Sequence, residues 1–131
     1  MLRQSLGAMA VVLLLAGFPS AQGLTLASSD ASAFVGTWVF AMAEPEGAQE
    51  TVRIMDKGGM IAATVQAQQF PPIEVSDVAK IGENLILRAT RFENGQPVEA
   101  LVILRLNGQT MNLIQELEGS TITKRGSGKK Q

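Results

Sequence analysis

The sequence predicts an all-β protein, specifically an eight-stranded antiparallel up-and-down β-barrel. Turn-forming residues recur about every 11 to 13 residues, near the spacing expected of short antiparallel strands. The segments between them alternate apolar and polar residues, as strands with one buried face do. The connections all have hairpin length, which favours a meander, and closing the sheet into a barrel removes its unpaired edges. A two-sheet sandwich is the alternative architecture.

The first 23 residues have the pattern of a secretory signal peptide. Arg3 supplies the positive charge, and the apolar stretch of 13 residues from Leu6 to Phe18 is too short to span a bilayer comfortably. We expect cleavage after Gly23, with Ala21 and Ala27 as alternative positions and an uncleaved anchor as the alternative fate. The mature chain is then periplasmic or secreted and keeps no transmembrane span.

The rest of the chain divides into an N-terminal segment (24–35), a barrel domain (36–126) and a flexible tail (127–131). A short helical turn is expected at 29–34. The turn signals leave eight predicted strands, at residues 36–43, 49–56, 60–69, 73–81, 85–92, 97–106, 110–117 and 120–125. Asn94–Gly95 and Asn107–Gly108 are the clearest hairpin signals, because Asn-Gly tolerates the positive φ that both central residues of a type I′ turn require.

Gly36, Thr37 and Trp38 open the first predicted strand, and Lys124 and Arg125 lie near the end of the last one. This arrangement resembles the lipocalins and the related calycin barrels. The resemblance implies that the Trp38 ring closes one end of the barrel. It also implies that Lys124 or Arg125 lies across that ring, a cation–π contact worth about 0.5–2 kcal/mol. The chain length and the Gly-Gly turn look more like small secreted bacterial β-barrel modules.

The strand face that carries Trp38 is almost wholly apolar, so we expect it to enclose one small apolar ligand. The residues expected to line the cavity are Trp38, Phe40, Met42, Ala63, Val65, Ala89, Ala100, Val102 and Met111. Gln115 is the clearest polar exception. The inward set contains no Arg or Lys, which argues against a clamp for a fatty-acid carboxylate. The alternative is a core filled by its own side chains.

Four apolar residues face outward instead, on three neighbouring predicted strands: Ile86, Leu101, Ile103 and Ile114. A contiguous exposed apolar patch usually marks a contact surface, so we expect a homodimer interface or a protein partner there. The alternatives are that residues 24–35 fold over the patch or that a bulge changes the facing. A second resemblance, to secreted bacterial protease inhibitors built on such barrels, implies that residues 24–35 enter a protease cleft.

The composition argues against catalysis and metal binding. Among 131 residues there is no His and no Cys, which removes the usual zinc ligands and the His- or Cys-based nucleophile pairs. The candidate carboxylates are Glu44, Glu46, Glu50, Asp56, Asp77, Glu93 and Glu116, and most of them lie at turns, where charged residues are normally solvated. Asp77 interrupts a strand pattern, and we expect it to cap a β-bulge by accepting backbone hydrogen bonds.

The charge balance argues against one class of binding partner, nucleic acid. The chain has 11 basic and 12 acidic residues, a formal net charge of −1, which gives no electrostatic footprint for nucleic acid. The sequence therefore predicts a non-catalytic protein without cofactor or metal that binds a small hydrophobic ligand. A protein-interaction module and a structural component of the cell envelope are the alternatives.

Overall fold

The computed structural model describes residues 25–131, and the predicted signal peptide at residues 1–23 lies outside the described residues. Two short 3-10 turns, η3 (Ser28–Asp30) and η4 (Ser32–Phe34), precede the strands. The strands are β1 (Gly36–Met42), β2 (Gln49–Lys57), β3 (Met60–Ala67), β4 (Ile73–Glu74), β5 (Asp77–Ile81), β6 (Asn84–Glu93), β7 (Gln96–Asn107), β8 (Thr110–Leu117) and β9 (Thr123–Lys130). The all-β prediction is confirmed. Within this part of the chain, no helix is long and apolar enough to cross a membrane.

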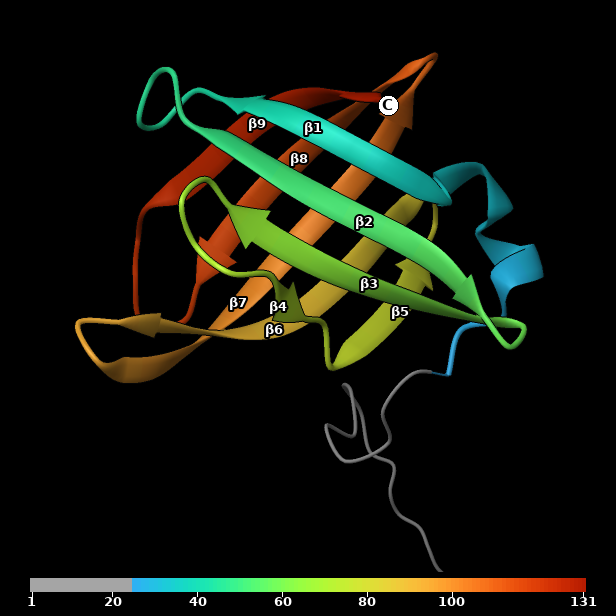
Figure 1. Ribbon diagram of the computed structural model, residues 1–131, viewed down its shortest axis with the longest axis horizontal. Helices are drawn as coiled ribbons and strands as arrows, with labels where there is room; N and C mark the ends of the chain where they lie inside the picture. Colours follow the sequence, from blue (N-terminus) through green and yellow to red (C-terminus); the bar gives the residue numbers. More distant parts are fainter. Residues whose placement is uncertain (1–24) are drawn as a thin grey trace, which may run out of the picture.

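The strands form one antiparallel sheet in the order β4-β3-β2-β1-β9-β8-β7-β6-β5. Except for β4 and β5, strands that follow one another in the chain also pair with one another. β1 and β9 pair as well, from Trp38↔Lys130 to Met42↔Gly126, so the meander curls back on itself into a barrel-like shape (Figure 1). The predicted meander order is therefore present.

The prediction of eight strands and a closed barrel is wrong at residues 73–81. The amide of Val75 donates to Ala63 O on β3 at 3.0 Å, and the amide of Ser76 donates to Arg88 O on β6 at 2.8 Å. Successive amides of an extended chain point to opposite sides, so the chain changes partner at this point. The change divides one predicted strand into β4 and β5 and leaves the sheet open between them. We call this opening the seam.

The last strand lies further along the chain than predicted. β9 continues to Lys130, so residues 127–130 of the predicted flexible tail belong to the sheet. A Cβ on Gly128 would lie 2.6 Å from Phe40 Cδ2 and 2.7 Å from Val39 O. Glycine inside a strand marks such a close approach. The glycines near the C-terminus therefore indicate tight packing against β1, whereas the sequence analysis took them as signs of flexibility.

Both predicted Asn-Gly signals lie at hairpins, with one of them shifted in register. Asn94 and Gly95 have φ values of 54° and 80°, as a type I′ turn between β6 and β7 requires. Between β7 and β8, Asn107 still pairs in the ladder. That loop therefore begins at Gly108, whose φ is 64°.

The N-terminal segment covers one end of the barrel. The amide of Ser28 donates to Gly59 O at 2.9 Å, which fixes the segment beside the start of β3. Ala31 and Phe34 are each 3% exposed and pack into the hydrophobic core. We call this end, on the right in Figure 1, the capped end. The opposite end, on the left, carries the connections 43–48, 68–72, 94–95 and 118–122, and we call it the loop end.

Candidate functional site

The residues predicted to line a ligand cavity lie in the core of the barrel. Phe40, Ala100 and Met111 have no exposed surface, and the others are at most 5% exposed: Trp38, Met42, Ala63, Val65, Ala89 and Val102. Apart from Ala100, they belong to one hydrophobic cluster. Their inward direction is confirmed, and their contact with a ligand stays a prediction.

Trp38 closes the capped end, and its cation differs from the predicted one. Trp38 is 3% exposed, and its Nε1 donates to Phe34 O at 2.8 Å. Lys130 Nζ lies 5.4 Å from the centroid of the Trp38 ring. The prediction of Lys124 or Arg125 in this position is wrong, because β1 and β9 are antiparallel and the start of β1 faces the end of β9.

The glycine of the Gly36-Thr37-Trp38 motif makes room for the same lysine. Gly36 has a φ of 143°, and a Cβ at this position would lie 2.8 Å from Lys130 Cε. The aliphatic chain of Lys130 therefore crosses Gly36 before its ammonium group reaches the Trp38 ring. Burial of lysine methylenes along an apolar surface is a common way to place the charged head.

A buried polar cluster lies near the loop end, inside the barrel. Glu50 is 6% exposed and Gln115 is 1% exposed, and the side chain of Arg91 is 14% exposed. Arg91 Nη1 donates to Gln115 Oε1 at 2.5 Å and lies 3.6 Å from Glu50 Oε2. Within the described chain, Glu50 Oε1 is buried without a hydrogen-bond partner. We call Glu50, Arg91 and Gln115 the polar cluster.

The polar cluster corrects two expectations from the sequence. The interior does contain an Arg, because Arg91 follows Ala89 on the inward face of β6. Glu50 is buried, unlike the solvated carboxylates with which the sequence grouped it, because it precedes Val52 on the inward face of β2. Each of the two residues lies two positions beyond the last apolar inward residue of its strand, so it points inward as well. This continued alternation was the signal available in the sequence.

A hollow of about 240 Å³ opens at the loop end, with Arg91 in its wall. The other residues around it are largely apolar: Ala67, Phe70, Pro71, Ile73 and Phe92, together with Glu93. Phe70 and Phe92 are 65% and 69% exposed, and they come from the connection 68–72 and from the end of β6. Two large exposed aromatic side chains beside one hollow make it a candidate contact site. We call it the loop-end hollow.

The predicted interface residues form a row across the outer face. Ile86 pairs with Ile103, and Ile103 pairs with Ile114, in the ladders of β6, β7 and β8. Ile114 is 36% exposed, and Ile86, Leu101 and Ile103 are half-buried. The N-terminal segment lies at the capped end beside β3. The outward facing of the four residues agrees with the prediction, and their contact with a partner stays a prediction.

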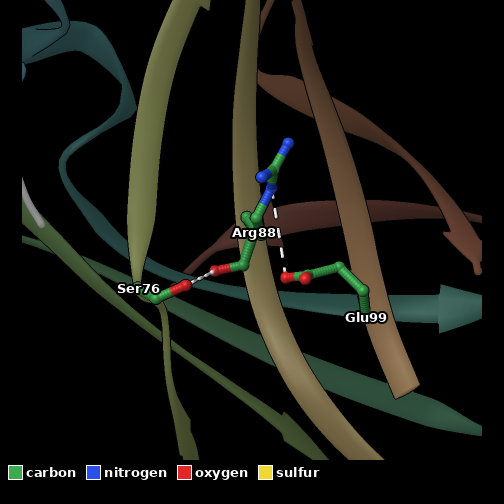
Figure 2. A network of polar contacts seen from close by, with 3 residues as sticks. All are labelled: Ser76, Arg88 and Glu99. Carbon is green, nitrogen blue, oxygen red and sulfur yellow. Dashed lines mark hydrogen bonds and ion pairs between the residues drawn. The ribbon is translucent and has the colours of Figure 1, made fainter. Parts of the chain in front are cut away.

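A second hollow, of about 620 Å³, lies on the same outer face and has largely polar walls, with Arg88, Glu99, Leu101 and Glu116 among its residues. Figure 2 shows the contacts beside it: Ser76 Oγ donates to Arg88 O at 3.1 Å, and Arg88 Nε lies 4.0 Å from Glu99 Oε2. The first contact holds the crossing point of the chain to β6, and the second joins β6 to β7. They explain how the seam is fixed, and they do not by themselves indicate a ligand.

Asp77 differs from the predicted bulge cap. It begins β5 directly after the crossing point and pairs with Arg88 in a regular ladder, so the interruption it marks is the change of partner. Asp77 is 2% exposed, and its Oδ2 has no hydrogen-bond partner in the described part of the chain. Among residues 25–131, no group of three His, Cys, Asp or Glu side chains is placed to hold a metal ion.

Comparison with known proteins assigns no family. A scan against protein-family models gives no match, and neither does a sequence comparison with curated proteins. Among solved structures, the chain is similar to a secretary abundant heat soluble (SAHS) protein of Ramazzottius varieornatus, described as from a dimer sample. The two are 9% identical with a TM-score of 0.44, over 75% of this chain and 95% of that chain. The description of the fold therefore depends on the strand order and register given above.

The loop-end hollow was not predicted from the sequence, because the predicted ligand-binding residues were the inward apolar residues of the strands. Phe70 directly precedes Pro71 and Pro72, and Phe92 lies two residues before Asn94. Aromatic residues beside turn signals are placed where a loop exposes them. That position was the available signal for this site.

Proposed function

We propose that this protein is an exported, non-catalytic, lipocalin-like barrel that binds one small, largely apolar molecule at its loop end. The observation that carries the proposal is the exposure of Phe70 and Phe92, 65% and 69%, which both line the loop-end hollow. An apolar cavity of about 150 Å³ is enough to bind benzene. The hollow of about 240 Å³ therefore suits a molecule with a single ring or a short aliphatic chain.

The position of the hollow favours binding at the mouth of the barrel over binding in its centre. Phe40, Val52 and Leu104 have no exposed surface and, with the rest of the hydrophobic cluster, occupy the interior. Exposed aromatic rings at the mouth lose water contact when a ligand covers them, which is favourable by about 25 cal/mol for each Å² removed from water.

Binding is tested by titrating the ¹⁵N-labelled protein with toluene and following amide chemical shifts. We expect the shifts to be centred on Ala67, Phe70 and Phe92, and to be lost in the variants Phe70→Ser and Phe92→Ser. Ile81→Ser is the matched control, because Ile81 is 60% exposed at the capped end. Shifts that are absent, or that survive both phenylalanine variants, would contradict the proposal.

Export is tested separately. Arg3 and the apolar stretch Leu6–Phe18 support it. N-terminal sequencing of the protein recovered from a bacterial periplasm is expected to give a chain that begins at Leu24. An uncut chain in the membrane fraction would overturn this part of the proposal.

A second candidate function is protein contact through the outer face. The direct cross-strand pairing of Ile86, Ile103 and Ile114 favours it, because apolar residues in register form one continuous surface. Light scattering over a range of protein concentrations is the test. Self-association that Ile103→Lys abolishes supports it, and a strict monomer at all concentrations argues against a homodimer.

A further inference from the structure

We infer that the polar cluster recognises the head group of the ligand, and that it selects a neutral amide or alcohol over a carboxylate. This inference rests on the proposed function of the loop-end hollow. It adds the chemical class of the ligand, an apolar body of about one ring that carries one neutral polar group.

Arg91 connects the hollow to the polar cluster. Its side chain forms part of the wall of the hollow, and its Nη1 contacts both Gln115 Oε1 and Glu50 Oε2. A guanidinium group has five N–H donors, and the contacts of Arg91 in the described chain use Nη1. Donors therefore remain on Arg91 for an oxygen atom of a ligand that enters the hollow.

Glu50 requires a hydrogen-bond donor on the ligand, whereas Arg91 requires an acceptor. Its side chain is 7% exposed, and its Oε1 is buried without a hydrogen-bond partner in residues 25–131. A buried acceptor is unfavourable until a donor reaches it. Glu50 does not line the hollow itself, so the inference requires that a donor group of the ligand passes Arg91 to reach Oε1. A primary amide or an alcohol placed in this way offers an oxygen atom to Arg91 and an N–H or O–H group to Glu50, so it satisfies both residues.

A carboxylate satisfies only one of them. The negative charge of Glu50 already neutralises Arg91 across 3.6 Å, so a second carboxylate meets a like charge inside the barrel. It also has no proton to donate to Glu50 at neutral pH. Glu93 in the wall of the hollow and Lys124, which pairs with Gln115, add one charge of each sign and leave no net attraction for an anion.

Three ligands that share one ring test this inference on the unmodified protein: ethylbenzene, phenylacetamide and phenylacetate. Dissociation constants come from the chemical shifts of residues around the hollow at pH 7. We expect phenylacetamide to bind at least about tenfold more tightly than phenylacetate, because like charges in a poorly solvated site are costly. Ethylbenzene is expected to lie between them or close to the amide.

The variant Glu50→Gln tests which residue causes the selectivity. It removes the charge that neutralises Arg91, so phenylacetate is expected to gain at least about tenfold and the order of the two polar ligands to reverse. Glu46→Gln is the matched control, because Glu46 is an exposed carboxylate in the connection 43–48 at the same end of the barrel and does not line the hollow. Its charge is screened by solvent, and we expect less than about a twofold change.

The outcomes separate the two proposals. If none of the three ligands shifts the resonances of Phe70 and Phe92, the proposed function fails. If ethylbenzene binds there but the amide and the carboxylate bind equally, or the carboxylate binds more tightly, the proposed function stands and the inference is overturned. The comparison on the unmodified protein decides this even if Glu50→Gln does not fold. An equal effect of Glu50→Gln and Glu46→Gln would also overturn it.

Discussion

The two ends of the barrel use similar residue types for opposite purposes. At the capped end, Trp38 and Phe34 are each 3% exposed, and Trp38 Nε1 finds a backbone acceptor. At the loop end, Phe70 and Phe92 are 65% and 69% exposed and flank a hollow. The capped end therefore uses its aromatic rings for stability, while the loop end leaves aromatic surface uncovered.

The charged groups at the two ends differ in the same way. Lys130 lies over the Trp38 ring with its head group exposed, so water solvates the charge. Arg91 is held inside the barrel by Glu50 and Gln115, where unpaired charge is expensive. The difference teaches that the inward face of this meander accommodates polar groups near the loop end, where Arg91 also lines the loop-end hollow.

The largest expected effect comes from removing the ring that closes the capped end. Trp38→Ala leaves a cavity at a position that is 3% exposed, and we expect a loss of about 3–5 kcal/mol in the free energy of unfolding. Phe92→Ala removes an exposed ring and is expected to change it by less than about 0.5 kcal/mol. Urea denaturation measures both. Similar losses for the two variants would show that the aromatic rings at the two ends contribute equally to stability.

The next effect concerns the polar cluster. Arg91→Met leaves Glu50 buried without a cation, and we expect a loss of about 3 kcal/mol. The double variant Glu50→Leu with Arg91→Met removes both charges and is expected to recover most of that loss. Arg105→Met is the control, because Arg105 and Glu83 form an exposed pair at 3.7 Å, worth about 0–1 kcal/mol. A double variant no more stable than Arg91→Met would contradict the assignment of a buried ion pair.

A smaller effect is expected in β9, between the two ends. Gly128→Ala places a Cβ 2.6 Å from Phe40 Cδ2 and 2.7 Å from Val39 O, and overpacking of this kind costs about 1–3 kcal/mol. Ser127→Ala, at the neighbouring exposed position, is expected to be nearly neutral. Equal denaturation midpoints for the two variants would mean that residues 127–130 do not belong to the sheet.

The sequence predicted the core well because the core follows from period-two alternation. Phe40, Val65 and Met111 are buried as expected, and Asn94–Gly95 forms the expected hairpin. The pattern did not predict the change of partner after Val75, because alternation is unchanged when a strand leaves one neighbour for another. The seam depends on long-range pairing, which a local pattern does not contain.

The same limit explains the misplaced last strand. Gly126 and Gly128 remove the alternation signal, so the predicted strand stopped at residue 125 and Lys130 was assigned to a tail. In the structure these glycines face Met42 and Phe40, whose side chains supply the bulk that β9 lacks. Only the pairing of β1 with β9 reveals this complementarity. The loop-end hollow was missed for a related reason, since it joins the connection 68–72 and the end of β6, which are far apart in the sequence.

The smallest expected effect distinguishes the cation over Trp38 from the one that the sequence predicted. Lys130 Nζ lies 5.4 Å from the ring centroid, and a cation–π contact at an exposed site is worth about 0.5–1 kcal/mol. Lys130→Gln is therefore expected to lose about that much stability, while Lys124→Gln at the other end of β9 is not. Trp38 is the single Trp of the chain, so its fluorescence reports on the contact directly. We expect the Trp38 emission of Lys130→Gln to change and that of Lys124→Gln to stay the same. The reverse result would show that Lys124 makes the cation–π contact with Trp38.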